Sequence, residues 1–142
     1  MLARSLWKAT LRRFSEESHK SGPGFVYIDT TNVFNPIGFI DEIVNKSKVL
    51  LFMKGTPESP QCGFSNYAVQ ALNYYNVKNY SYVNILENPT IREEVKKYSD
   101  WPTYPQLYLN KEFIGGCDIL SDMHKNGTLK DLFEKHGVVS KD

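Results

Sequence analysis

Cys62 is the residue of this sequence best suited to carry chemistry. It lies between an apolar run that predicts a buried strand and a segment whose apolar spacing predicts a helix. A sulfur at a helix start faces unpaired backbone amides and the positive end of the helix dipole, which favour a thiolate. Lys54, at the end of the preceding strand, can bring a positive charge near this sulfur. We therefore expect a reactive or metal-ligating thiolate at Cys62.

The sequence contains one other cysteine, Cys117, and it is not part of a paired motif. Ser65 stands three residues after Cys62, where a Cys-x-x-Cys motif would have its second thiol. Cys62 therefore has no disulfide partner within its own motif, and the pattern offers no structural zinc site. Two cysteines are also too few for a disulfide-stapled secreted scaffold, which indicates a reducing compartment. For Cys117, an isolated cysteine, we expect a packing role.

The elements around these cysteines follow from apolar spacing and from helix and turn signals. Val49–Met53 is continuously apolar, as a strand buried on both faces should be. In chain order the pattern predicts a helix from Asn35-Pro36 through Val44, strand 49–53, a helix over 67–75, strand 80–85, a helix from Asn88-Pro89 through Tyr98, strands 106–109 and 112–114, and helical segments at 120–123 and 129–133. We assign no role to the apolar stretch 25–28.

The order of these elements predicts an α/β fold. Strand, helix, strand and helix in succession favour parallel pairing. The last two strands are separated only by Asn110-Lys111, a hairpin spacing that requires antiparallel pairing. A parallel βαβ unit followed by a hairpin and a helix is the thioredoxin fold, with a four-stranded mixed sheet flanked by helices.

Three motifs resemble signatures of the monothiol glutaredoxins. Lys54–Ser65 resembles the active-site signature with its Cys-Gly-Phe-Ser motif, and residues 101–105 and 115–118 resemble the other two, in the same order. The resemblance covers residues 38–137 and is closest to the mitochondrial single-domain branch that serves iron–sulfur cluster assembly. We expect the glutaredoxin domain at 38–137, followed by a tail at 138–142.

The resemblance implies glutathione binding around Cys62. The residues implied to contact glutathione are Lys54, Cys62, Gly63, Phe64, Arg92, Thr103, Tyr104, Pro105, Gly116, Cys117 and Asp118. A cis peptide bond before Pro105 is expected to free the Tyr104 backbone to pair with the cysteinyl unit. Asp118, expected at the start of the following helix, would hold the γ-glutamyl end. Arg92 either binds the glycyl carboxylate or is merely solvated.

The tyrosines depart from the family pattern, and the role of Cys117 has an alternative. Tyr104 stands where relatives often carry isoleucine, and Tyr74, Tyr75 and Tyr98 add aromatic side chains. We expect these rings to reshape the substrate groove without touching the thiol. In this branch the position of Cys117 is close enough to the active-site thiol to form a disulfide under oxidation, which is the alternative to packing.

Two functions from different classes use the same residues. A 2Fe–2S cluster needs four thiolates; Cys62 supplies one, so two protomers and two glutathiones would complete a cluster-bound homodimer. Such a carrier would serve apo iron–sulfur proteins and assembly factors. The alternative is a glutathione-dependent thiol–disulfide oxidoreductase, in which Cys62 attacks a glutathionylated protein and a second glutathione resolves the mixed disulfide. The resemblance to the carrier branch ranks cluster transfer first and leaves enzymatic activity open.

Charge and hydropathy exclude two classes of partner. Seventeen basic and sixteen acidic residues give a formal charge of +1, and no basic block could follow a phosphate backbone, so we expect no nucleic acid. The longest apolar run, Val49–Met53, is far shorter than the roughly 20 residues that a bilayer requires, so we expect no membrane insertion.

The first residues have the composition of a mitochondrial transit peptide. Residues 1–14 carry four basic side chains and no acidic one. The run Arg12-Arg13-Phe14-Ser15 resembles a matrix-peptidase site and predicts cleavage after Phe14, and hence a mitochondrial matrix location. Residues 15–37 are expected to be a linker or N-terminal extension of unknown role.

Overall fold

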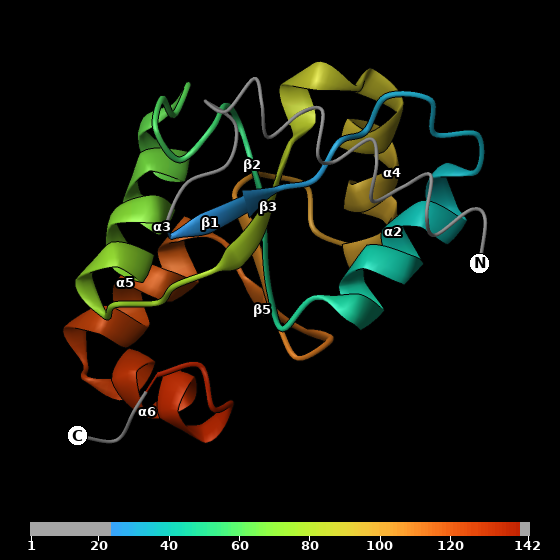
Figure 1. The fold of residues 1–142 in the computed structure, drawn as a ribbon. Helices are drawn as coiled ribbons and strands as arrows, with labels where there is room; N and C mark the ends of the chain where they lie inside the picture. Colours follow the sequence, from blue (N-terminus) through green and yellow to red (C-terminus); the bar gives the residue numbers. More distant parts are fainter. Residues whose placement is uncertain (1–23, 140–142) are drawn as a thin grey trace.

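The computed structural model describes residues 24–139, in which helices cover both faces of a five-stranded mixed sheet (Figure 1). The predicted transit peptide at 1–14, the cleavage site after Phe14, the first part of the predicted linker and the last residues of the predicted tail lie outside the described residues. Within residues 24–139, no helix has the length and apolar character needed to span a bilayer.

The chain alternates between strands and helices. The elements are β1 (Phe25–Tyr27), α2 (Pro36–Lys46), β2 (Val49–Met53), α3 (Gly63–Tyr74), β3 (Tyr80–Asn84), the 3-10 turn η1 (Ile85–Glu87), α4 (Pro89–Ser99), β4 (Gln106–Leu109), β5 (Glu112–Gly115), α5 (Cys117–Lys125) and α6 (Thr128–Lys135). The strand order is β1-β3-β2-β4-β5. β3 pairs in parallel with β1 and β2, and β4 pairs antiparallel to β2 and β5. The predicted parallel βαβ unit and hairpin are confirmed.

The sheet has one strand more than the four predicted. The unassigned stretch Phe25–Tyr27 pairs with residues 80–82 of β3. The rings of Phe25 and Tyr27 contact the Tyr82 ring, at centroid distances of 5.8 and 5.7 Å. Three residues are too few to show strand periodicity, so only the distant partner β3 identifies this strand. Part of the expected linker is therefore an edge strand.

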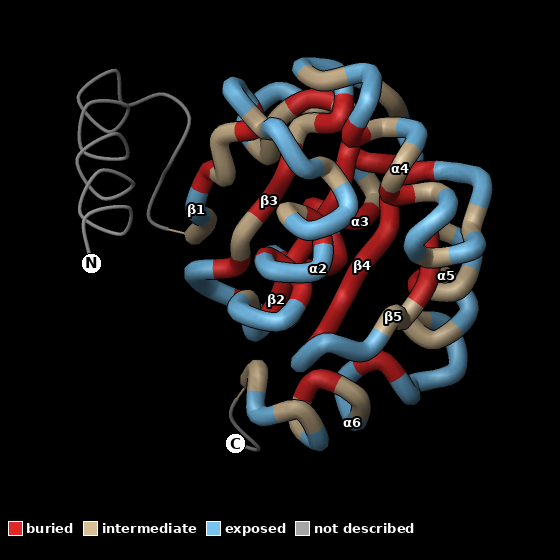
Figure 2. Tube along the Cα trace, turned by 90° about the vertical axis from the view of Figure 1, so that its right-hand side faces the viewer, coloured by how far each residue is buried: buried red, intermediate tan, exposed pale blue. Residues whose placement is uncertain are grey.

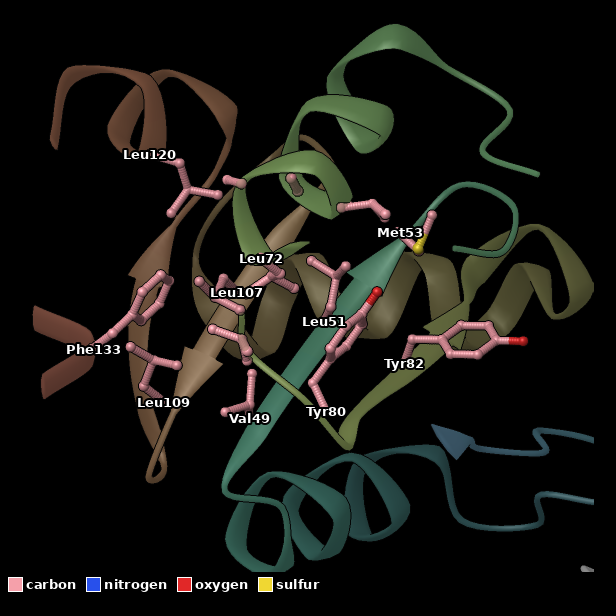
Figure 3. Close-up of a cluster of buried hydrophobic side chains, with 14 of the residues drawn as sticks. Val49, Leu51, Met53, Leu72, Tyr80, Tyr82, Leu107, Leu109, Leu120 and Phe133 are labelled. Carbon is pink, nitrogen blue, oxygen red and sulfur yellow. The ribbon is translucent and has the colours of Figure 1, made fainter. Parts of the chain in front are cut away.

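β2 is the centre of the structure, and all five of its residues are buried. Successive side chains of a strand point to opposite faces of the sheet. Leu50 and Phe52 pack into the cluster beneath α2 and α4. Val49, Leu51 and Met53 pack into the cluster beneath α3, α5 and α6 (Figure 3). Figure 2 shows this buried layer running through the middle strands, which explains the continuous apolar run.

The predicted start signals of two helices are confirmed. The Asn35 side chain accepts a hydrogen bond from the Gly38 amide at 3.2 Å and caps α2.

The hairpin turn between β4 and β5 is also confirmed, with positive φ angles of 49° at Asn110 and 75° at Lys111. Such left-handed conformations match the twist of a two-residue hairpin.

Asn88 connects the N-terminal extension to α4. Its side-chain oxygen accepts from the Ile91 amide at 3.0 Å and caps the helix. Its side-chain nitrogen donates to the Thr30 carbonyl, also at 3.0 Å. The segment after β1 is therefore fixed against the start of α4, the helix that carries Arg92.

We expect Asn88→Ala to lower the free energy of unfolding by about 1 to 2 kcal/mol, because it removes both the cap and the bond to Thr30. Asn88→Ser should lose roughly half as much, since a hydroxyl oxygen can still cap the helix. Urea unfolding followed by circular dichroism measures both. An Asn88→Ala protein as stable as the wild type would contradict this account.

Candidate functional site

Strand pairing brings the predicted site residues to one end of the sheet. Phe52, near the carboxyl end of β2, pairs with Gln106, the first residue of antiparallel β4. The turn 103–105 therefore enters the sheet next to the point where Lys54 leaves it. Loops at the carboxyl ends of neighbouring strands are a common place for ligand sites in α/β proteins.

The glycine motif after β5 reaches the same end of the sheet. β5 ends at Gly115, which pairs with Leu107 near the start of β4. A Cβ atom on the next residue, Gly116, would lie 3.0 Å from the Pro105 carbonyl oxygen and 3.2 Å from Trp101 Nε1. Glycine permits this close backbone approach. The loop that begins α5 therefore packs directly on the turn that begins β4.

Cys62 occupies the N-cap position of α3, as the sequence predicts. Its backbone is extended, and its sulfur accepts a hydrogen bond from the Ser65 amide at 3.3 Å. The side chain is half-buried, whereas the following Gly63 and Phe64 are exposed. The sulfur thus faces the first free amides of the helix while remaining accessible from outside.

Ser65 makes hydrogen bonds at the site that the sequence did not reveal. Its hydroxyl lies 3.5 Å from the Cys62 sulfur and accepts from the Lys54 backbone amide at 3.0 Å. Because its oxygen accepts from Lys54, its own proton is available to a thiolate. Ser65 is the third residue of α3, a position from which a side chain can reach back to the N-cap, and this is the signal that could have indicated its role.

The pKa values of the two thiols are shifted in opposite directions. Burial acts to raise the pKa of Cys62, but the Ser65 hydroxyl, the backbone amides at the start of α3 and the charge of Lys54 outweigh it and hold that pKa below its ordinary value. Burial, followed by the charges of Asp118 and Cys62, raises the pKa of Cys117. Both cysteines are free thiols. Cys62 is thus the stronger nucleophile and ligand at neutral pH.

The turn before β4 has the predicted backbone and a brace that was not predicted. The Tyr104–Pro105 peptide bond is cis. The fully buried Gln106 side chain donates to the carbonyl oxygens of Trp101 and Thr103, at 3.0 and 3.2 Å. Gln106 is a polar residue at the start of an otherwise apolar strand, and that contrast is the signal that could have marked it.

The loop between β2 and Cys62 is closed on itself. The Gln61 amide donates to the Lys54 carbonyl at 2.9 Å, and Gly55 and Pro60 form a β-bridge. Gly55 has a φ angle of +95°, a backbone conformation that residues other than glycine rarely adopt. Its amide donates to the Asn84 side chain at 2.9 Å, another contact that was not predicted. Asn84 thereby anchors the loop to the end of β3.

Asp118 lies in the first turn of α5, at the start of the helix as expected, but it is not the N-cap. The N-cap of α5 is Gly116, and Cys117 is its first helical residue. Asp118 is exposed in the first turn and forms no capping hydrogen bond. The helix begins early because Gly116 is fixed against the turn before β4. The Asp118 carboxylate still lies near the positive end of the helix dipole.

Tyr104 and Tyr98, whose rings were expected to reshape the substrate groove without touching the thiol, are engaged in core packing and helix contacts. The Tyr104 side chain is only 5% exposed and packs in the core cluster of α2 and α4. Its hydroxyl donates to the Arg92 carbonyl at 2.6 Å. The Tyr98 hydroxyl donates to Asp41 at 2.9 Å and joins α4 to α2. Both hydroxyls therefore help to hold α4 in place.

Tyr74 and Tyr75 lie at the end of α3 opposite Cys62. The Tyr75 hydroxyl is 2.6 Å from Nδ1 of His124 on α5. An open depression of about 410 Å³ is formed here by Tyr67, Gln70, Ala71, Asn73, Tyr74 and His124. None of these residues belongs to the predicted glutathione set, so the extra aromatic rings lie away from the thiol.

The predicted residues differ in accessibility. Gly63, Phe64, Thr103 and Asp118 are exposed, Lys54, Cys62, Arg92 and Cys117 are half-buried, and Tyr104, Pro105 and Gly116 are buried. Among the exposed and half-buried residues, all but Gly63 have side chains that an incoming molecule can reach. Arg92 lies in the first half of α4, whose start follows the carboxyl end of β3.

Comparison with known proteins identifies the family. The glutaredoxin family model matches residues 49–114. The zebrafish (Danio rerio) protein "Glutaredoxin-related protein 5, mitochondrial" is 48% identical over 101 residues, which cover 71% of this chain and 65% of the relative. "Probable monothiol glutaredoxin 2" of Rickettsia typhi is 49% identical over 96 residues, which cover 68% of this chain and 86% of the relative. The chain therefore spans less than two thirds of the zebrafish relative.

Solved structures show the same fold. A monomeric truncated mutant of Trypanosoma brucei 1-C-Grx1 matches with a TM-score of 0.67 and 35% identity, covering 75% of this chain and 96% of that one. A buckwheat glutaredoxin, solved as a glutathione complex, matches with a TM-score of 0.62 over 74% of this chain and 93% of that one. At 17% identity this second match shows the fold alone.

The sequence relatives, the fold and the thiol motif agree. The Rickettsia protein matches over most of its length, and in this chain a serine replaces the second thiol of the motif. The chain belongs to the monothiol glutaredoxins.

Proposed function

We propose that the protein binds glutathione at Cys62 and, as a homodimer, carries a glutathione-ligated 2Fe–2S cluster to apo-proteins in the mitochondrial matrix. The observation that carries this proposal is a single thiol held toward the thiolate form, with Ser65 as its hydrogen-bond partner in place of a second thiol. One such thiolate can ligate a metal or attack a disulfide. Alone it can neither complete the four thiolate ligands of a cluster nor resolve the mixed disulfide.

Glutathione matches the groups gathered at this end of the sheet. Lys54 and Arg92 offer positive charges to its carboxylates, and the cis turn offers the Tyr104 backbone to its cysteinyl unit. The first turn of α5, with Asp118, offers backbone amides and a carboxylate to its γ-glutamyl end. The buckwheat glutaredoxin, solved as a glutathione complex, is an example of a protein with this fold that binds glutathione.

A shared cluster would satisfy the ligand count. A 2Fe–2S cluster takes four thiolates, and Cys62 supplies one from each protomer, which leaves two for glutathione. Residues 24–139 contain no group of three or more His, Cys, Asp or Glu side chains able to hold a metal ion. Cys62 is accessible, and Phe64 beside it is 64% exposed, so a second copy can approach the thiol. The cluster is the cargo, and apo iron–sulfur proteins and assembly factors are its expected partners.

Anaerobic incubation with iron, sulfide and glutathione should give the wild-type protein a visible chromophore and shift it to a dimer on a sizing column. Cys62→Ser should gain neither, because it removes the ligand from both protomers. Wild-type protein without glutathione is the matched control and should also stay colourless. An equal chromophore in Cys62→Ser, or one formed without glutathione, would refute the carrier proposal.

The low pKa of Cys62 also favours a second candidate, a glutathione-dependent oxidoreductase. Its thiolate would attack the glutathione sulfur of a glutathionylated protein, releasing that protein's thiolate and leaving glutathione bound to Cys62 through a disulfide. A second glutathione would then attack this mixed disulfide, release oxidised glutathione and restore Cys62. This reaction requires one protein thiol and no dimer.

The pKa directions predict that Cys62 reacts with iodoacetamide at lower pH than Cys117. Ser65→Ala should move the pH midpoint of Cys62 alkylation upward, because the thiolate loses a hydrogen-bond donor. Site-resolved mass spectrometry over a pH series gives both midpoints, with Ser47→Ala, at the far end of α2, as the serine control. An unchanged Cys62 midpoint in Ser65→Ala would show that the hydroxyl does not stabilise the thiolate.

The matrix location is supported by the basic composition of residues 1–14 and by the mitochondrial name of the zebrafish relative. Protein recovered from purified mitochondria should begin at Ser15 when its N-terminus is sequenced. An intact Met1 on the imported protein would count against processing after Phe14.

A further inference from the structure

Tyr104 makes a contact that the proposed function does not use. Its aromatic ring is buried in the core, and its hydroxyl emerges at α4, where it donates to the Arg92 carbonyl at 2.6 Å. Neither phenylalanine nor isoleucine at this position could make the contact, because neither side chain has a hydroxyl. The contact is therefore a property of the tyrosine side chain.

This hydrogen bond is a direct side-chain link between two parts of the site, each of which also has an anchor of its own. The turn 103–105 is braced from the sheet side by Gln106, which binds the carbonyls before and within it. The start of α4 is braced by Asn88, which is bound in turn to Thr30. Tyr104 belongs to the turn and reaches α4, so it fixes one of these parts relative to the other.

The two parts face different ends of the proposed ligand. The Tyr104 backbone is placed to pair with the cysteinyl unit of glutathione, and Arg92 to bind its glycyl carboxylate. A bidentate or charge-assisted contact loses much of its strength when its geometry relaxes. The distance between the turn and α4 therefore sets whether both ends can be bound at once.

We infer that Tyr104 is a positioning residue that selects for the glycine end of glutathione: its hydroxyl holds Arg92 in register with the turn that binds the cysteinyl unit. This inference rests on the proposed glutathione binding and adds to it a determinant of specificity. A ligand without the glycyl residue, such as γ-glutamylcysteine, gains nothing from this register.

The test compares two ligands in the same exchange reaction. Reduced protein is equilibrated with the disulfide and thiol forms of glutathione, and separately with those of γ-glutamylcysteine. In each case Cys62 takes one half of the disulfide and releases the other half as a thiol, so no further oxidant is needed. Mass spectrometry of the Cys62 peptide gives the equilibrium constant for each ligand.

Tyr104→Phe keeps the ring and removes the hydroxyl, and Tyr104→Ile repeats the loss of the hydroxyl with an aliphatic side chain. Both should lower the glutathione constant about fivefold, the factor that one hydrogen bond contributes. Both should leave the γ-glutamylcysteine constant unchanged. In an Arg92→Ala background the Tyr104→Phe change should have no further effect. Tyr98→Phe, which removes a hydroxyl elsewhere on α4, is the control and should behave as the wild type.

Three results would overturn the inference. An equal loss for both ligands would mean that Tyr104 only supports the fold. A loss that persists in the Arg92→Ala background would mean that it does not act through Arg92. Unchanged constants for both ligands in Tyr104→Phe and Tyr104→Ile would mean that the hydroxyl has no role. Wild-type protein that forms no mixed disulfide with glutathione would instead refute the proposed function itself.

Discussion

The burial of β2 on both faces is the constraint on which the rest of the structure depends. A fully apolar central strand needs a helical layer above and below it, and it needs a neighbouring strand on each side to satisfy its backbone. Because one neighbour is parallel and the other antiparallel, the end of β2 meets the end of β3 and the beginning of β4. The thiol loop, its Asn84 anchor and the cis turn are thereby gathered at a single place.

At that place the sulfur is controlled by groups that the fold supplies for other reasons. Cys62 caps α3, and capping brings it the free amides that every helix start possesses. Ser65 ties the same sulfur to the backbone of Lys54, so the end of the strand and the start of the helix share one hydrogen-bonded unit. Cys117 lies close by on another helix without these donors, and its pKa moves the other way.

Local signals in the sequence were enough for the central strands, the hairpin and the capped helices, since Asn35 and Asn88 act on residues next to them in the chain. The features that were not predicted depend on distant partners. β1 exists only through β3, and α5 begins where it does because Gly116 meets Pro105. Periodicity and capping rules contain no such information. The depth of Tyr104, likewise, follows from packing and not from its neighbours in the chain.

The short strand β1 also affects how the sheet meets other molecules. An exposed sheet edge is a template onto which another chain can add its own strand. Here the outermost strands are β1, with three residues, and β5, with four, and β5 begins with the exposed Glu112. Such short borders give a second chain few backbone groups to pair with. The short edges thus limit strand addition at the sheet, whereas the thiol end presents the exposed side chain of Phe64.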